Sequence, residues 1–269
     1  MIPGIGAATE AILAAVLEPL VTDLSDASLD NREFTLLSAE EDEAQRLGIR
    51  FNGGPELTIV VTDPTRPLGD IRVQTGGKNN VMFFDNARWG GNCHASIRML
   101  GDDCLIFFND IGDGYVAIPD LLMRSHNQLL YWGIGATAVG ISMEIEGEGR
   151  SFVIGDDALI SNGVWIRNYD MHSLHDLGTG VQISRPACDT VLERHVWLGQ
   201  DALLMSCERI GMGTVVGARA LLKGYAPPRV VMAGTPARVV REGTSWGRHP
   251  YGMTAEERVS IGLPGQPET

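Results

Sequence analysis

The sequence predicts an all-β solenoid, a parallel β-helix built from hexapeptide repeats. Two observations support this prediction: an aliphatic residue recurs every six positions across residues 192–222, and glycine directly follows three of these residues. The six aliphatic positions are Leu192, Leu198, Leu204, Ile210, Val216 and Leu222. A period of six matches neither a helix nor a simple strand. It is typical of a coil in which each rung buries its apolar residue by stacking on the next rung.

Composition agrees with this fold and excludes several partners. The chain has 269 residues, of which 33 are glycine and only 6% aromatic, as turning rungs require. The net charge of −13 argues against a nucleic-acid partner and weakly against a strongly anionic acceptor. No lysine or arginine precedes Arg32, so no secretory signal is evident, and Glu10 and Glu18 interrupt the only segment long enough for a membrane span. Four cysteines without a C-x-x-C pair predict reduced thiols in a cytoplasmic protein.

Residues 1–50 are expected to form a helical extension ahead of the coil. Ile5–Val21 has the apolar spacing of an amphipathic helix, and a short helix is expected around residues 39–47 with Ser38 as its cap. Strand patterns follow at residues 57–62, 71–73 and 81–84, separated by glycine and proline turns.

An internal repeat extends the predicted coil toward the N-terminus. Leu100–Ile106 and Ile154–Ile160 share the pattern aliphatic-Gly-Asp-Asp-small-Leu-Ile, which places Leu100 and Ile106 in the coil. The β-helix is therefore expected over residues 70–241, although no register can be assigned between residues 107 and 153.

The period of six then breaks once. It runs from Ile154 through Ile166, stops at Tyr169 and resumes at Leu192, so residues 170–191 are predicted to leave the coil as a loop. A loop of this length within a regular solenoid is usually functional. Residues 242–269 are expected to form a short helix, begun by a capping box at Thr254–Glu257, and a tail.

Three segments resemble one family. They are His195–Gly199 (HVWLG), Val231–Arg241 (VMAGTPARVVR) and the loop start Asp170–Ser173. Together with the hexads up to Lys223, they resemble the left-handed β-helix acyltransferases with hexapeptide repeats, most of all the galactoside, maltose and capsule-polysaccharide O-acetyltransferases. The resemblance covers residues 150–241 and is absent from residues 1–50 and 245–269. It implies a left-handed coil, a homotrimer with active sites between subunits, and acetyl-CoA lying along the coil, with no metal.

The resemblance also implies roles for particular residues. His172 matches the catalytic base, and Trp197 matches the tryptophan that lines the acceptor and thioester end. The residues that correspond to donor contacts are Gly217 and Ala218 for the pantetheine arm, Lys223 for the nucleotide end, and Arg238 and Arg241 for the phosphates. Two segments depart from the family pattern, Met205–Cys207 and Lys223–Pro227, and the second affects the donor contacts.

The chemistry of acyl transfer fits these residue types. An acceptor hydroxyl must lose its proton as it attacks the thioester, and a neutral imidazole suits that role near pH 7. Asp170 either orients the imidazole or forms a turn. His175 is an alternative base or an exposed loop residue, and Glu146 is expected to reach the acceptor. Direct transfer needs no covalent intermediate, so no cysteine nucleophile is required.

The sequence therefore predicts a cytoplasmic, trimeric O-acetyltransferase that uses acetyl-CoA and acts on a sugar or glycan precursor. One alternative is N-acetylation of an amino sugar or antibiotic. Another is a zinc hydro-lyase resembling γ-carbonic anhydrase, with His172, His175 and His195 as ligands. The last is a non-catalytic scaffold. The sequence does not name the acceptor or the length of the acyl group.

Overall fold

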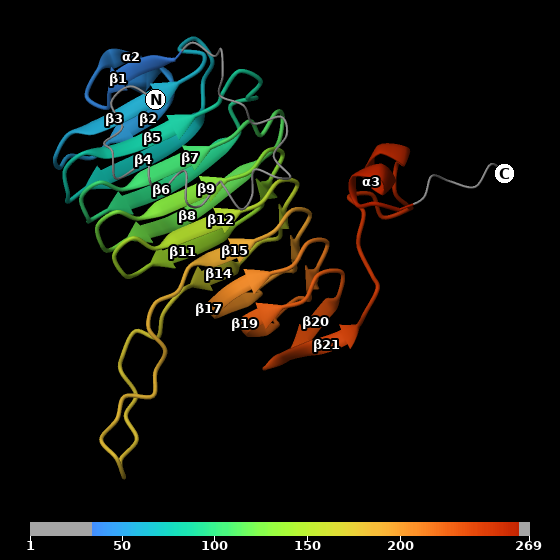
Figure 1. Ribbon diagram of the computed structural model, residues 1–269. Helices are drawn as coiled ribbons and strands as arrows, with labels where there is room; N and C mark the ends of the chain where they lie inside the picture. The colour runs from blue at the N-terminus through green and yellow to red at the C-terminus, as the bar shows by residue number, and fades with distance from the viewer. Residues whose placement is uncertain (1–33, 264–269) are drawn as a thin grey trace.

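The described part of the protein winds into one long parallel coil from which an extended loop projects (Figure 1). This computed structural model describes residues 34–263, so the predicted helix at Ile5–Val21 lies outside the described residues. Each turn of the coil contributes strands to three faces, and the strands within each face pair in parallel with their counterparts one rung away.

The first face stacks strands from both ends of the coil. Its strands are β3 (Leu57–Val61), β5 (Asn80–Phe84), β7 (Leu105–Phe108), β9 (Leu129–Trp132), β12 (Ser151–Ile154) and β15 (Thr190–Leu192), followed by the C-terminal parts of β17 (Leu203–Ile210) and β19 (Leu221–Ala226).

The other two faces share three long strands in the N-terminal half, β4 (Gly69–Thr75), β6 (Cys93–Met99) and β8 (Val116–Met123), which bend from the second face onto the third. The second face continues through β10 (Thr137–Ala138), β13 (Leu159–Ile160), β16 (Trp197–Leu198), β18 (Val215–Val216) and β20 (Val231–Gly234). The third face begins at β2 (Ile49–Phe51) and continues through β11 (Ile141–Ile145), β14 (Val164–Arg167) and the N-terminal parts of β17 and β19.

The hexads predict this register correctly. Leu192 pairs with Ile210, Leu198 with Val216 and Leu204 with Leu222, so three successive hexads make one rung of three faces. All six side chains are buried. The glycine corners are required by close stacking: a Cβ on Gly211 would lie 2.3 Å from the Pro228 nitrogen, and one on Gly199 would lie 2.6 Å from the Ala218 nitrogen.

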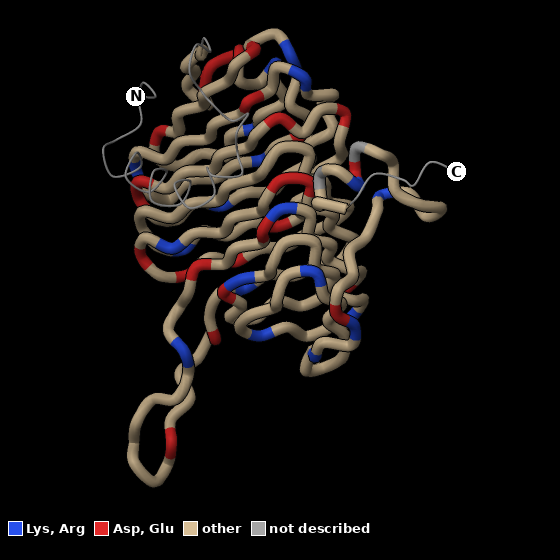
Figure 2. The backbone as a smooth tube through the Cα atoms, turned by 45° about the vertical axis from the view of Figure 1, so that its right-hand side comes forward, with Lys and Arg blue, Asp and Glu red and all other residues tan. Residues whose placement is uncertain are grey.

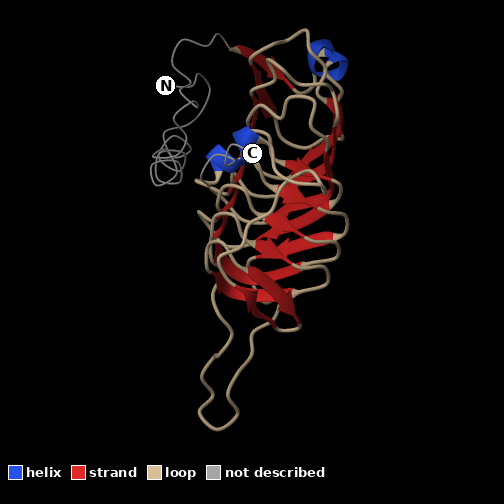
Figure 3. Cartoon of the chain, turned by 90° about the vertical axis from the view of Figure 1, so that its right-hand side faces the viewer, coloured by secondary structure: helices blue, strands red, loops and turns tan. Residues whose placement is uncertain are grey.

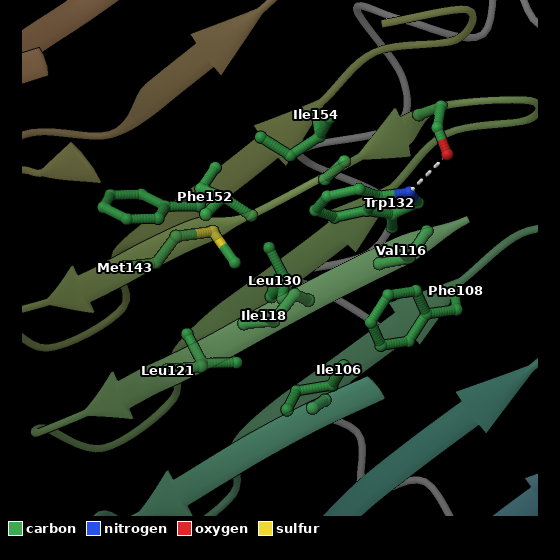
Figure 4. Packing of buried hydrophobic residues seen from close by; sticks show 14 of the residues in the cluster. Ile106, Phe108, Val116, Ile118, Leu121, Leu130, Trp132, Met143, Phe152 and Ile154 are labelled. Atoms are coloured by element: carbon green, nitrogen blue, oxygen red, sulfur yellow. Dashed lines mark hydrogen bonds between the residues drawn. The ribbon is translucent and has the colours of Figure 1, made fainter. Parts of the chain in front are cut away.

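The core of the N-terminal half is filled by larger side chains. Phe84 stacks on Phe108 with ring centroids 5.5 Å apart, and Trp132 follows at 5.7 Å. Because the buried Trp132 indole needs a partner, its Nε1 donates to the Ala136 carbonyl at 3.0 Å (Figure 4). Phe83, Phe107 and Tyr131 form a second aromatic stack on the outer side of the first face.

Antiparallel strands close both ends of the coil. β1 (Thr35–Ser38) pairs with β3, and β21 (Ala237–Arg241) pairs with β20. The parallel coil starts at β2 and β3, earlier than the predicted start near residue 70. The short helix α2 (Asp42–Arg46) begins at Glu41, so Ser38 is not its cap.

The C-terminal helix is confirmed as α3 (Ala255–Ser260), with the predicted capping box between Thr254 and Glu257. The equivalence of the internal repeat is wrong: Leu100 is 45% exposed at a corner, and Ile106 lies on the first face whereas Ile160 lies on the second. Within residues 34–263, neither helix is long and apolar enough to cross a membrane.

Candidate active site

Residues 170–189 leave the coil as a hairpin-like arm between β14 and β15, at the edge where the third face meets the first, while Thr190 and Val191, expected in the loop, already belong to β15. Figure 3 shows the arm extending past the end of the coil. The buried Asn168 ties both ends of the arm together, because its Nδ2 donates to the Glu146 carbonyl at 2.9 Å and to the Cys188 carbonyl at 2.8 Å. The two halves of the arm are joined by backbone hydrogen bonds such as Ile183 N–H to the Leu174 carbonyl at 2.7 Å.

His172 and His175 both lie in the exposed part of the arm. The His175 ring bonds within the arm, to the Ser173 hydroxyl at 3.1 Å and the Gly180 carbonyl at 3.4 Å. His172 lies two residues beyond Asp170, whose carboxylate accepts a contact from Lys223 Nζ at 3.4 Å. The structure thus brings Asp170, a predicted catalytic residue, into contact with Lys223, which is predicted to bind acetyl-CoA. Lys223 therefore lies at the base of the arm.

Trp197 lies on a different side of the coil. It points outward from β16 on the second face, and its Nε1 donates to the Ser161 hydroxyl one rung away at 3.3 Å. The second face lies opposite the edge from which the arm departs. Within one chain, therefore, the arm and Trp197 do not form a common site.

Of the residues predicted to bind the acyl donor acetyl-CoA, all but Lys223 lie on the same side of the coil as Trp197. Arg238 and Arg241 are exposed on β21, which closes the second face. Gly217 and Ala218 form the corner just after β18. The Gly217 N–H already donates to the Met232 carbonyl at 2.8 Å, so the exposed Ala218 is the better placed of the two to face a pantetheine arm. The charges and the small corner residues suit a phosphate-bearing thioester.

Glu146 belongs to the coil and lies on the same side of it as the arm. Its Oε1 accepts from the Ser125 hydroxyl at 2.9 Å, close to Asn168 and away from Trp197. The neighbouring Glu144 is held by Arg124 at 2.8 Å and Arg167 at 2.5 Å. Burial raises the pKa of Glu144, but the two arginines outweigh that effect and leave the pKa below its usual value. Glu144 is therefore an ionised structural group.

A segment without a sequence signal packs beside Trp197. Residues after β21 fold back along the coil, and the ring of Trp246 stacks on His195 with centroids 4.2 Å apart and lies 6.0 Å from Trp197. His195 is buried and bonds to Asp157 at 2.6 Å and to the Trp246 carbonyl at 2.8 Å. His195 is therefore a structural residue of the coil, and its burial separates it from the exposed His172 and His175.

The cysteines are poorly suited to nucleophilic catalysis. Burial raises the pKa of the Cys93 and Cys207 thiols to about 12, that of Cys104 to about 11, and that of Cys188 above its ordinary value. A thiol must ionise to act as a nucleophile. The geometry thus favours direct transfer between two bound substrates.

Comparison with known proteins identifies the family. The chain is 30% identical to the polysialic acid O-acetyltransferase of Neisseria meningitidis over 182 residues, which span 66% of this chain and 80% of that protein. The chain belongs to the hexapeptide-repeat left-handed β-helix acetyltransferases. A shorter match, 33% identical over 101 residues, links it to the galactoside O-acetyltransferase of Escherichia coli K12, with coverage of 36% of this chain and 47% of that protein. No family model matches the chain.

Solved structures agree on the fold of these acetyltransferases. The polysialic acid acetyltransferase NeuO superposes with a TM-score of 0.63 at 20% identity, covering 78% of this chain and 93% of that one. The polysialic acid O-acetyltransferase OatWY gives a TM-score of 0.56 at 25% identity, with coverage of 77% and 94%. Both matches span nearly the whole length of their counterparts.

Proposed function

We propose that this protein transfers an acetyl group from acetyl-CoA to a hydroxyl group of a glycan, in a site formed between subunits of a homotrimer. The observation that carries the proposal is the separation of the arm from Trp197 on opposite sides of one coil. Since the relatives are sugar and polysaccharide O-acetyltransferases, a complete site requires the arm of one subunit to reach Trp197 of its neighbour.

The surface of the arm supports such an assembly. Five of its large apolar side chains are exposed in the isolated chain: Met171, Leu174, Leu177, Val181 and Ile183. Figure 2 shows that few charged residues lie along the arm. Apolar groups gathered on a projecting hairpin are typical of a segment that packs against a partner, and a neighbouring coil would cover them.

The chemistry then proceeds by direct transfer. His172 accepts the proton of the acceptor hydroxyl as its oxygen bonds to the thioester carbonyl carbon. Backbone N–H groups at the coil corners stabilise the oxyanion. The carbon–sulfur bond breaks, and the proton held by His172 passes to the departing thiolate. Asp170, held by Lys223, fixes the start of the arm, while Arg238 and Arg241 bind phosphates of the donor.

The test is release of free thiol from acetyl-CoA with a panel of sugars, oligosaccharides and polysaccharides. His172→Ala is expected to lower turnover about 10²- to 10⁴-fold and to leave the rise in melting temperature caused by CoA unchanged. His175→Ala is the matched control, since it removes the other exposed histidine of the arm, and it is expected to retain turnover. Loss of turnover in His175→Ala with normal turnover in His172→Ala would overturn the assignment of the base.

A further inference from the structure

A groove follows the edge where the second face meets the third, in the N-terminal half of the coil. Its volume is about 410 Å³. Its lining includes one position from each of five successive rungs, Asp70, His94, Ala117, Val139 and Asn162. With rungs about 4.8 Å apart, these positions span roughly 19 Å along the coil.

The groove leads toward Trp197. Asn162 directly follows Ser161, the residue that accepts the hydrogen bond from the Trp197 indole. Ala218, expected to contact the donor, lies on the same edge beyond Trp197, since β18 stacks on β16. One edge of the coil therefore presents the groove, then Trp197, then the donor residues, in that order.

Small residues in successive rungs keep the groove open. Ala95 and Ala117 line it where the pairing of β6 with β8 slips in register between Ala95 and Ile97. Gly140 lies in the next rung, where a Cβ would come within 2.4 Å of Asn162 Oδ1. Larger side chains at these positions would fill the channel.

The lining has the chemistry of a sugar-binding surface. Hydrogen-bonding groups come from Asp70, Arg72, His94, Ser96 and Asn162, interleaved with apolar side chains. The half-exposed ring of Tyr115 lies beside His94, with centroids 5.6 Å apart. Alternating polar groups and apolar or aromatic faces match the hydroxyl groups and C–H faces of a sugar chain.

The two charged residues that line the groove, Asp70 and Arg72, offset each other at a distance of 3.5 Å. Outside the lining, Arg50 contacts Asp70 at 3.2 Å, and Arg98 pairs with Asp120 on the adjoining face at 2.9 Å. The lining itself therefore carries no excess of positive charge to offset the chain's net charge of −13, so a densely anionic polymer would be repelled.

We propose that this groove binds several sugar units of a neutral glycan chain and delivers one hydroxyl group of that chain to the centre beside Trp197. The inference rests on the proposed function and adds the class of acceptor: a polymer rather than a single sugar, and neutral rather than polyanionic. Donor and acceptor then approach Trp197 along one edge from opposite ends.

The experiment measures thiol release from acetyl-CoA for neutral gluco- and galacto-oligosaccharides from one to eight units, with oligosialic acid of equal lengths alongside. Wild type is expected to show kcat/KM at least tenfold higher for the longest neutral acceptor than for the single sugar. Ala117→Trp, which fills the groove, should bring this ratio close to one. His94→Ala, a change at an exposed residue, should lower it several-fold. Thr58→Trp is the matched control, a half-buried strand position at another edge, and should keep the wild-type ratio.

Each alternative outcome is decisive. Equal kcat/KM for short and long acceptors in wild type, or an unchanged ratio in Ala117→Trp, would contradict binding of the acceptor in the groove while leaving the proposed function intact. Preference for oligosialic acid would contradict the proposal that the acceptor is neutral. Absence of thiol release with every acceptor would instead contradict the proposed function. Saturation-transfer NMR with the neutral octasaccharides would then test whether the groove binds a glycan. Signals seen with wild type and lost in Ala117→Trp would support binding in the groove, and equal signals in the two proteins would contradict it.

Discussion

The two halves of the coil reach the same fold with rungs of different length. In the C-terminal half, Leu192 pairs with Ile210, a rung of 18 residues. In the N-terminal half, Phe84 pairs with Phe108 and Phe108 with Trp132, each 24 residues on. Longer rungs enclose a wider core, which aromatic side chains fill, whereas one aliphatic residue per face fills the narrow rungs. The wide half carries the groove, and the narrow half carries the arm and the predicted donor residues.

The wide half should be the more sensitive to loss of a core side chain. Trp132→Ala removes a fully buried indole that packs on Phe108 and bonds to the Ala136 carbonyl. We expect a loss of about 3–5 kcal/mol in the free energy of unfolding, measured by denaturant titration. Val216→Ala in the narrow half is the comparison and should cost less, because it leaves a smaller cavity. Equal losses would mean that the two cores are packed alike.

Closely stacked glycine corners should be sensitive to added atoms in both halves, since a Cβ on Gly101 in the wide half would lie 1.9 Å from the Ser125 carbonyl oxygen. Gly211→Ala places a Cβ 2.3 Å from the Pro228 nitrogen, so the rungs must separate. We expect a cost of about 1–3 kcal/mol. Gly112→Ala in the wide half is the control, since its Cβ meets no atom within 4 Å and only its φ of +57° is unfavourable. A larger loss at Gly112 would show that backbone conformation, rather than stacking, limits these corners.

The smallest expected loss of stability concerns Asp157, which anchors the C-terminal segment that contacts both halves of the coil through Trp246 and Arg248. Asp157 contacts His195 at 2.6 Å and Arg248 at 2.7 Å. Burial raises its pKa, but these partners outweigh burial and lower the pKa below the ordinary value. Because the folded pKa is lowered, the ionised carboxylate stabilises the fold above the ordinary carboxyl pKa, and this contribution is lost as pH falls through the lowered value.

Asp157→Asn is therefore expected to cost about 1–2 kcal/mol at pH 7, allowing for solvent screening of a part-exposed group. Chemical denaturation at pH 7 and near pH 3 measures the difference, which should shrink at the acid end. A constant difference between wild type and variant at both pH values would show that the charge of Asp157 is not involved.

The same contrast explains what the sequence reveals. In the narrow half each face takes one hexad, so the period of six predicts the register and the position of the arm. In the wide half the extra residues per rung obscure that period, so the sequence assigns no register to residues 107–153, and the internal repeat misplaces Leu100. Candidate residues of the site were found by resemblance, but their distribution over opposite sides of the coil follows only from the pairing of strands.

The segment around Trp246 had no signal at all. Trp246 contacts His195 across 51 residues of sequence, and Arg248 reaches the Gly135 carbonyl across 113. Such contacts depend on the chain folding back after the coil ends, and no local pattern of residues encodes that return. The antiparallel strands at the two ends of the coil were missed for the same reason.

The most direct test of the account asks whether the arm and Trp197 act between subunits. Subunits carrying His172→Ala and Trp197→Ala, each with its own affinity tag, would be co-expressed, purified through both tags and assayed by thiol release with the best acceptor. Each variant alone should be inactive, whereas every trimer that carries both tags has one intact site among its three interfaces, so the mixed protein should regain roughly a third of wild-type turnover. A mixed protein as inactive as its two parents would contradict a site shared between subunits.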